Sequence, residues 1–490
     1  MRAHSWAVVA AVVLGSWTSA ASAQFCDAPA LSGALALAAP GEVVLVGDCT
    51  VSGSFLVPAG VTLQGTTSLS GIAIPPGSGR VELQPSPTAT TPTTLRNLTV
   101  QSASRGAVIT EGAGAVRVQQ VTVDATRGIG IGAQGLSSLV LDRVVATGPV
   151  TAASAPTIPS NPDRDVTATF GVVIIDVVSA DVRDLSVGGF AAAGVLTVRG
   201  ATQWTGGVST ANVGAGLFAV GGDVSLASVQ LDGQYRGART GSDWAAGLMA
   251  SHGAYVDTID TDLTRNEGWG AFFDGTSNVV IDRARIDHNR HAGVWMQAAG
   301  GLQIDNSTIS HDGVVGVVGL GSDIVSMSGT RVQQARGTAP PGLFPVGDGI
   351  ELDSTRGDFS GVSLVGNTRV GLLADLGDTL APSAIRFSAV TVVGPAGAKG
   401  ILIQRNGVPL ALPVDGIRRL GTTGRSDAAW AAGGTGFDLG GYVSPELMPI
   451  GDGIGGYVSP ELNPWGLALL LGTKGGNQNP PPTPGDNPAP

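Results

Sequence analysis

The sequence has little charge, few aromatic residues and almost no lysine. Of its 490 residues, 13% are charged and 5% aromatic, and the formal net charge is −11. Lysine occurs only at Lys399 and Lys474. Nucleic acids and anionic membranes attract a basic stripe, which this chain lacks, so we expect neither as a partner. After residue 23 no stretch reaches about 18 apolar residues without polar breaks, and we therefore predict no transmembrane segment.

Residues 1–23 have the features of a secretory signal peptide. Arg2 supplies the positive charge, Ala7 to Leu14 the apolar run, and Ala21, Ser22 and Ala23 a cleavage site of small residues. The sequence therefore predicts a secreted protein that is extracellular or at the cell surface, with the periplasm as a further compartment.

The chain has two cysteines, Cys26 and Cys49, both near the predicted mature N-terminus. Secretion places them in an oxidising compartment, which favours a Cys26–Cys49 disulfide. Two free thiols are the alternative.

Glycine, in contrast, is abundant at 75 residues, and many of these residues follow a regular series. A glycine followed by a mostly apolar triplet recurs at a base period of 22 to 24 residues, with four longer steps. The series consists of Gly106, Gly130, Gly171, Gly194, Gly216, Gly247, Gly270, Gly293, Gly316, Gly349, Gly371 and Gly400.

A second segment between these glycines alternates apolar and polar residues, as in Val279, Ile281 and Ile286. Such alternation indicates a strand with one buried face. A unit of about 23 residues with three short strands and three turns is one coil of a parallel β-helix, which we expect to be right-handed. We therefore predict an all-β fold, a right-handed parallel β-helix of about twelve coils of 22–24 residues.

Another column precedes the glycines by four residues. It contains Asn212, Asn266, Asn289, Asp312 and Asn367. Asn and Asp suit tight corners, and stacked Asn side chains can hydrogen-bond along the column. A structural ladder is the favoured interpretation of this column, and a functional site is the alternative.

The repeat resembles the pectin-lyase-like superfamily of right-handed parallel β-helix proteins, over about residues 41 to 404. Residues 40–46 (PGEVVLV) and 57–65 (VPAGVTLQG) are similar to the first coils of that superfamily. The resemblance implies the fold but not one activity, because members include lyases, hydrolases, epimerases, tailspikes and structural surface proteins. The sequence signatures of polygalacturonases and pectate lyases are not found.

The expected organisation is a signal peptide at 1–23, an N-terminal cap with the first coils at 24–105, and the β-helix at 106–404. A C-terminal capping segment follows at 405–470 and a Pro-rich disordered tail at 471–490. The capping segment contains the sequence GGYVSPEL twice, at 440–447 and 455–462, with no function that we assign.

The longer steps come mainly from insertions at about 149–167, 236–244 and 336–346, all just before the glycine column. We predict that the last two wall a cleft whose floor is formed by the coils between them. In this hypothesis His288 or His311 transfers protons, Glu267 or Asp312 orients the imidazole, and Arg265, Arg290 and His291 bind substrate. A solvated structural turn is the alternative.

The position two residues after each glycine is expected to point out of the helix, which creates an apolar stripe with Phe218, Phe272 and Trp295. The stripe has three interpretations. Phe218, Phe272 and Trp295 form a platform for sugar rings, the stripe is a homo-oligomer interface, or the segment with Tyr442, Tyr457 and Trp465 covers it.

These observations predict a secreted protein that binds or acts on a polysaccharide or cell-surface glycan through loops on one edge of the helix. The alternative is a non-catalytic structural or adhesive surface protein. The sequence assigns no metal or other cofactor and leaves open whether the protein is an enzyme.

Overall fold

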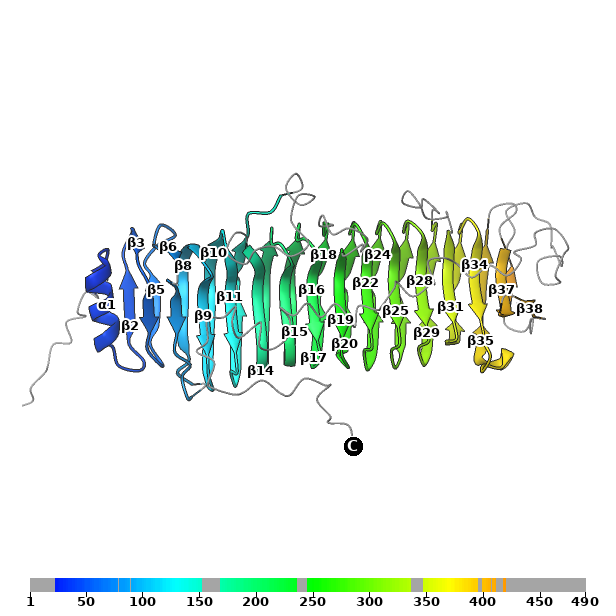
Figure 1. Cartoon of the computed structure of the whole chain (residues 1–490), viewed down its shortest axis with the longest axis horizontal. Coiled ribbons are helices and arrows are strands. Elements are labelled where there is room, and N and C mark those ends of the chain that lie inside the picture. Colours follow the sequence, from blue (N-terminus) through cyan, green and yellow to red (C-terminus); the bar gives the residue numbers. More distant parts are fainter. Residues whose placement is uncertain are drawn as a thin grey trace, which may run out of the picture.

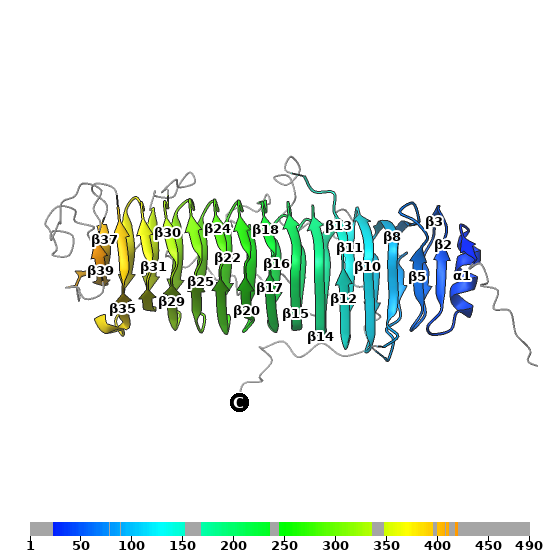
Figure 2. The ribbon, with the colours of Figure 1, turned by 180° about the vertical axis from the view of Figure 1, so that it is seen from behind.

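A computed structural model describes residues 23–77, 79–88, 90–151, 168–235, 245–335, 347–394, 399–406, 408–410 and 417–419. In this part of the chain, short strands follow one another around a common axis and stack into a long rod (Figures 1 and 2). The strands of each coil pair with those of the next coil, in parallel, through three continuous stacks. No helix among the described residues is long and apolar enough to cross a membrane.

The first stack contains the strands of the glycine series. Its members are β4 (Phe55–Val57), β7 (Val81–Leu83), β9 (Gly106–Glu111), β11 (Gly128–Gln134), β14 (Ala168–Gly188), β15 (Ala193–Thr210), β16 (Ala215–Val220), β19 (Ala246–Ser251), β22 (Trp269–Asp274), β25 (Ala292–Gln297), β28 (Val315–Leu320), β31 (Asp348–Asp353), β34 (Val370–Asp375) and β37 (Lys399–Arg405).

The second stack contains the alternating segments, and the long strands β14 and β15 contribute to all three stacks. Its other members are β1 (Gln24–Phe25), β2 (Val43–Val46), β5 (Thr62–Gly65), β8 (Thr93–Ser104), β10 (Ala115–Ala125), β12 (Ser138–Asp142), β17 (Asp223–Ala227), β20 (Tyr255–Ile259), β23 (Asn278–Asp282), β26 (Leu302–Asp305), β29 (Ile324–Ser328), β32 (Arg356–Ser360) and β35 (Ile385–Ser388).

The third stack leads back to the glycine strands, and β8 and β10 also extend into it. Its other members are β3 (Thr50–Ser52), β6 (Gly71–Gly77), β13 (Val145–Thr147), β18 (Gln230–Asp232), β21 (Asp262–Thr264), β24 (Arg285–Asp287), β27 (Thr308–Ser310), β30 (Arg331–Gln333), β33 (Ser363–Val365), β36 (Val390–Val393) and β39 (Ile417–Arg419). A 3₁₀ turn at Pro382–Ala384 and β38 (Val408–Pro409), which pairs with β37 in antiparallel fashion, complete the described elements.

The register confirms the glycine column, with one correction. Ala271 pairs with Val294 and Val294 with Val317, so Gly270, Gly293 and Gly316 lie in line. In the first coil of the series, Ile131 pairs with Val108, which places Ala107 and not Gly106 beside Gly130. The prediction for Gly106 was therefore wrong by one residue. Val108 belongs to the interior cluster and Ile109 to the outer one.

The predicted inside and outside positions are otherwise confirmed. Leu248 and Ala250, one and three residues after Gly247, belong to the continuous interior cluster. Phe218, Met249, Phe272 and Trp295 belong to a separate cluster on the outer face of the first stack. Alternation along each strand thus produces one core inside the rod and a second apolar layer outside it.

Helix α1 (Ala28–Leu37) closes the N-terminal end of the rod (Figure 1). Asp27 caps it by accepting a hydrogen bond from Ala30 N at 3.1 Å. Leu31 and Leu35 are buried against the first coils and so cover the apolar interior that an open end would expose to water. The predicted Cys26–Cys49 disulfide is confirmed and connects β1 to the chain after β2, with Cα atoms 5.8 Å apart.

Several predicted segments lie outside the described residues. These are most of the signal peptide, the insertions at 236–244 and 336–346, both GGYVSPEL copies, and almost all of 405–490, including Tyr442, Tyr457 and Trp465.

We predict that removing the disulfide loosens the N-terminal cap. Replacing Cys26 and Cys49 by serine releases a loop that joins residues 23 positions apart, which should cost about 3 kcal/mol. Hydrogen exchange should show faster exchange in β1, α1 and β2, while the strands beyond β16 keep their protection. Unchanged exchange in the cap would contradict the role assigned to the disulfide.

Candidate functional site

A line of buried polar side chains holds the corner between the third and the first strand of successive coils. The side-chain oxygen of each member accepts a hydrogen bond from the backbone N–H of the member one coil earlier. Asn289 Oδ1 accepts from Asn266 N at 3.2 Å, and Asp312 Oδ1 accepts from Asn289 N at 3.0 Å. We call this line the polar ladder. It comprises Asn212, Gln234, Asn266, Asn289 and Asp312, each at most 1% exposed.

The polar ladder confirms the structural interpretation of the Asn column and adds a member. Gln234 stands beside an insertion, and its longer side chain accepts from Asn212 N at 3.1 Å. Ala335 interrupts the line, and its backbone N–H donates to Asn367 Oδ1 at 3.3 Å. Asp312 lies in the polar ladder and not on the exposed surface of the corner.

The residue before each position in this line adopts a left-handed backbone. Before Asn266, Asn289, Asp312 and Ala335 these residues are Arg265, His288, His311 and Gln334, with φ of 55°, 59°, 55° and 56°. The side chain of His311 is half-buried and the other three are exposed. The backbone N–H of His288 donates to Ser310 O, and that of His311 to Gln333 O, each at 3.1 Å. Consecutive coils therefore present their side chains in one exposed column.

His288, His311 and Asp287 form the closest cluster of titratable groups at this corner. The imidazole rings stack with centroids 4.8 Å apart. Nδ1 of His288 lies 2.8 Å from one carboxylate oxygen of Asp287, and Nδ1 of His311 lies 2.9 Å from the other. Ser310 Oγ donates to the same carboxylate at 2.8 Å. Asp287 was not among the predicted site residues, although its place at the end of the third strand, directly before His288, is a usable signal.

The electrostatic balance keeps Asp287 ionised. Burial acts to raise the pKa of this carboxyl, but hydrogen bonds from His311, His288 and Ser310 outweigh it and leave the pKa lowered. With a proton on each Nδ1, both imidazoles donate to one carboxylate, and each Nε2 keeps its lone pair. The carboxylate that contacts both imidazoles is thus that of Asp287, and not that of Asp312, which was predicted to orient them. The cluster can anchor imidazoles for proton transfer or offer three ligand atoms to a cation.

The other predicted floor residues differ in their surroundings. Arg265 pairs with Asp232 through two nitrogens, with its Nε 2.8 Å from Asp232 Oδ1. Arg290 is exposed and makes no ion pair with any described residue. Glu267 is half-buried, as is His291, whose ring lies 5.9 Å from that of Trp269.

The flanking strands place the two predicted walls on either side of this cluster. One insertion joins β18 to β19 and the other joins β30 to β31, at the corner that also carries the polar ladder. The three intervening corners, after β21, β24 and β27, have no insertion. The insertions themselves lie outside the described residues, so the cleft stays a prediction.

Comparison with known proteins supports the fold. Residues 240–404 match a family model for the right-handed β-helix region. No curated protein sequence matches the chain. Together with the three parallel stacks, this match decides the architecture. Over its described residues the chain is a right-handed parallel β-helix.

Solved structures similar to this β-helix protein share little sequence with it. The periplasmic alginate epimerase AlgG is 12% identical over 81% of this chain and 82% of that chain, with a TM-score of 0.38. The A-module of the Azotobacter vinelandii mannuronan C-5 epimerase AlgE6 is 14% identical over 81% and 95%, with a TM-score of 0.39. The Dettilon tailspike protein is 11% identical over 76% and 59%, with a TM-score of 0.29. Similarity at this level carries no information about activity.

The outer apolar stripe of the β-helix does not form an open aromatic platform. Phe272 is 1% exposed and Trp295 6% exposed. Trp269 packs against both, with ring centroids 4.8 Å from Phe272 and 6.4 Å from Trp295. Neither ring presents a free face on which a sugar can stack, so we do not place them in a binding site.

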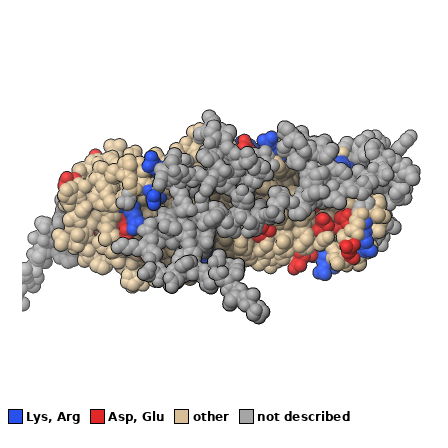
Figure 3. Space-filling model, in the orientation of Figure 1, with Lys and Arg blue, Asp and Glu red and all other residues tan. Residues whose placement is uncertain are grey.

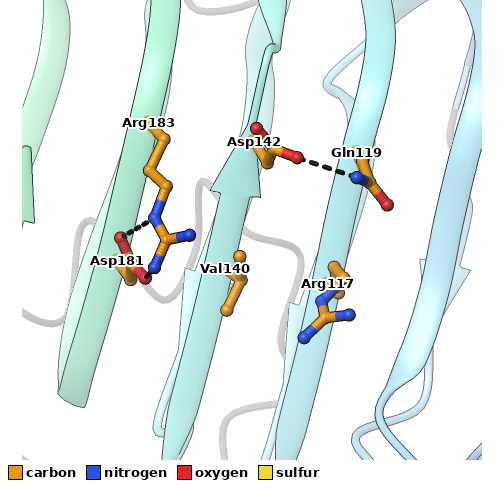
Figure 4. A pocket seen from close by; sticks show the side chains of 6 residues that line it. All are labelled: Arg117, Gln119, Val140, Asp142, Asp181 and Arg183. Atoms are coloured by element: carbon orange, nitrogen blue, oxygen red, sulfur yellow. Dashed lines mark hydrogen bonds and ion pairs between the residues drawn. The ribbon is translucent and has the colours of Figure 1, made fainter. Parts of the chain in front are cut away.

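A depression of about 250 Å³ lies on the second stack, over β10, β12 and β14 (Figure 4). Arg183 pairs with Asp181 on the same strand, and Gln119 donates to Asp142 at 2.8 Å. Arg117 alone projects into it without a partner among the residues drawn. On the face shown in Figure 3, the visible charged side chains lie mainly toward the two ends of the rod, where acidic and basic groups are mixed. The depression is therefore a weaker candidate than the histidine corner.

We predict that replacing Asp312 by asparagine stabilises the β-helix at neutral pH. Burial raises the pKa of Asp312 well above its ordinary value, although hydrogen bonds from Asn289 oppose the effect. The folded protein then holds this proton more tightly than the unfolded chain, so the contribution of Asp312 to stability falls as pH rises above about 3.8.

Asparagine at position 312 does not titrate, so it removes the loss of stability that Asp312 causes as pH rises, and it keeps the oxygen that accepts hydrogen bonds from Asn289. Its amide can also donate to the preceding coil, as Asn289 Nδ2 donates to Leu263 O at 3.0 Å. Unfolding in denaturant at pH 7 should show a gain on the order of 1 kcal/mol, which shrinks toward pH 4. A gain that does not depend on pH would contradict a raised pKa of Asp312 in the folded protein.

Proposed function

We propose that this protein is secreted and binds an acidic polysaccharide along the corner formed by Arg265, His288, Arg290 and His311. The observation that carries the proposal is the exposed guanidinium of Arg290, which makes no ion pair among the described residues, on the same corner as the exposed imidazole of His288 and the half-buried imidazole of His311. Arginine binds carboxylates with two parallel hydrogen bonds, which suits sugars that carry a carboxylate.

The repeating geometry of the corner supports a polymer as the ligand. Consecutive coils present equivalent positions about 4.8 Å apart, the spacing of paired strands. A chain of repeated sugar units that lies along the rod therefore meets the same kind of position several times. The insertions on either side of this stretch would bound the occupied segment.

Two other exposed arginines of the same coil are engaged differently. Arg283 pairs with Asp260 and Asp282, and Arg285 with Asp262. These pairs neutralise the local charge and leave no free guanidinium for a sugar carboxylate. Arg290 is therefore the side chain through which binding should be most sensitive to mutation, whether or not the protein also turns its ligand over.

Replacing Arg290 by alanine should weaken the binding of polygalacturonate or alginate by about tenfold, the loss expected for one charged hydrogen-bonding group. The affinity is measured by calorimetry in the presence of a chelator, so that no metal contributes. Neutral dextran should not bind to either protein.

Arg283→Ala is the matched control, since it removes an exposed arginine from another corner of the same coils. Its affinity should equal that of the wild type. If neither acidic polysaccharide binds the wild type, the proposal fails, and a structural or adhesive role without a glycan ligand replaces it. Equal losses in both variants would indicate non-specific charge attraction.

A further inference from the structure

We propose that Asp287, His288 and His311 bind one divalent cation of the late first-row transition metals, such as Zn²⁺. One ligand atom from each residue lies within 4.8 Å of the others. This inference goes beyond polysaccharide binding and does not depend on it, because the three ligands belong to the chain alone.

The positions of the three groups are close to those that a metal requires. Ligands bound to one zinc ion at about 2.1 Å lie roughly 3.4 Å apart in a tetrahedron. Both Nδ1 atoms already lie 2.8 and 2.9 Å from oxygens of the same carboxylate. Side-chain rotations that move the two Nδ1 atoms together by about an ångström complete the site. The cation takes the place of the protons that the imidazoles otherwise donate to Asp287.

The backbone and a neighbouring hydroxyl hold these ligands in place. His288 and His311 occupy the same position on adjacent coils, and the pairing of Asp287 with Ser310 fixes their register. Ser310 Oγ donates to Asp287 Oδ1 at 2.8 Å and so orients the carboxylate, as hydrogen bonds around metal ligands commonly do. The side chains are 20%, 47% and 26% exposed for Asp287, His288 and His311, which leaves a path for the ion and room for water ligands.

The donor set selects the class of metal. Two imidazole nitrogens and one carboxylate suit Zn²⁺, Ni²⁺ or Cu²⁺, whereas Ca²⁺ and Mg²⁺ prefer oxygen ligands only. Two of the nearby guanidinium groups are offset by carboxylates, because Arg265 pairs with Asp232 and Arg285 pairs with Asp262, whereas Arg290 makes no ion pair with a described residue.

The test is calorimetric titration of the chelator-treated full-length protein with Zn²⁺ alone at pH 7.5, without polysaccharide. We expect one saturable site per chain and no such site for Ca²⁺. His288→Asn and His311→Asn should each weaken Zn²⁺ binding more than about tenfold. Asparagine is chosen because it tolerates the left-handed backbone at both positions, so the variants should fold.

His252→Asn is the matched control, since His252 also has a left-handed backbone but bonds to Ser251 outside the cluster. It should bind Zn²⁺ like the wild type. Absence of a saturable site, or equal affinity in the His288 and His311 variants with intact unfolding transitions, would overturn the metal site. Because no sugar is present, that result leaves the test of polysaccharide binding by Arg290 unaffected.

Discussion

The backbone N–H groups at the inner corner of each coil need hydrogen-bond acceptors, and this need shapes the molecule. Strands satisfy their own N–H groups by pairing with the next coil, but a chain that turns between strands leaves buried donors. The polar ladder supplies the missing acceptors. Asn266 Oδ1 accepts from Gln234 N at 3.1 Å, and Asn289 Oδ1 accepts from Asn266 N at 3.2 Å, so each coil depends on its neighbour.

The glycine column is a second consequence of the same corner. A Cβ atom on Gly270 would lie 2.5 Å from the carbonyl oxygen of Gly293 and 2.8 Å from Asn289 Nδ2. Only glycine leaves room for the next coil and its ladder side chain at this distance. The side chains on the inner face of the corner stabilise the fold. The residues available for binding or catalysis are those just before the ladder members, which include His288 and His311.

Much of the fold was predictable from the sequence, because the need for a side-chain acceptor and for a glycine at each corner places Asn and Gly at regular intervals along the chain. The glycine period, the Asn column, the outward position of Phe272 and the Cys26–Cys49 disulfide were all predicted correctly. Gly106 was misassigned because Ala107 occupies the column place in that coil and the adjacent glycine imitates it.

The candidate site was less predictable, since it depends on contacts between coils. The role of Asp287 becomes visible only in the structure, where the imidazoles of His288 and His311, from two adjacent coils, both contact its carboxylate. Asp312 is next to His311 in sequence, yet its side chain turns inward to accept hydrogen bonds from Asn289. Sequence neighbours thus diverge to opposite faces of the corner, whereas residues 23 positions apart meet.

The proposed site therefore depends most on the placement of His288 beside His311 on adjacent coils, which engineered cysteines test directly. Replacing both by cysteine should give a disulfide under mild oxidation, because paired coils lie about 4.8 Å apart, within the reach of a disulfide. Arg265 and Gln334 have the same left-handed backbone conformation as His288 and His311, so residues other than glycine or asparagine, including cysteine, should be tolerated at these positions. His288→Cys with Gln334→Cys, two coils apart at about 9.6 Å, should not form a bond. Peptide mapping that finds the second link as readily as the first, or neither, would contradict the stacking on which the site rests.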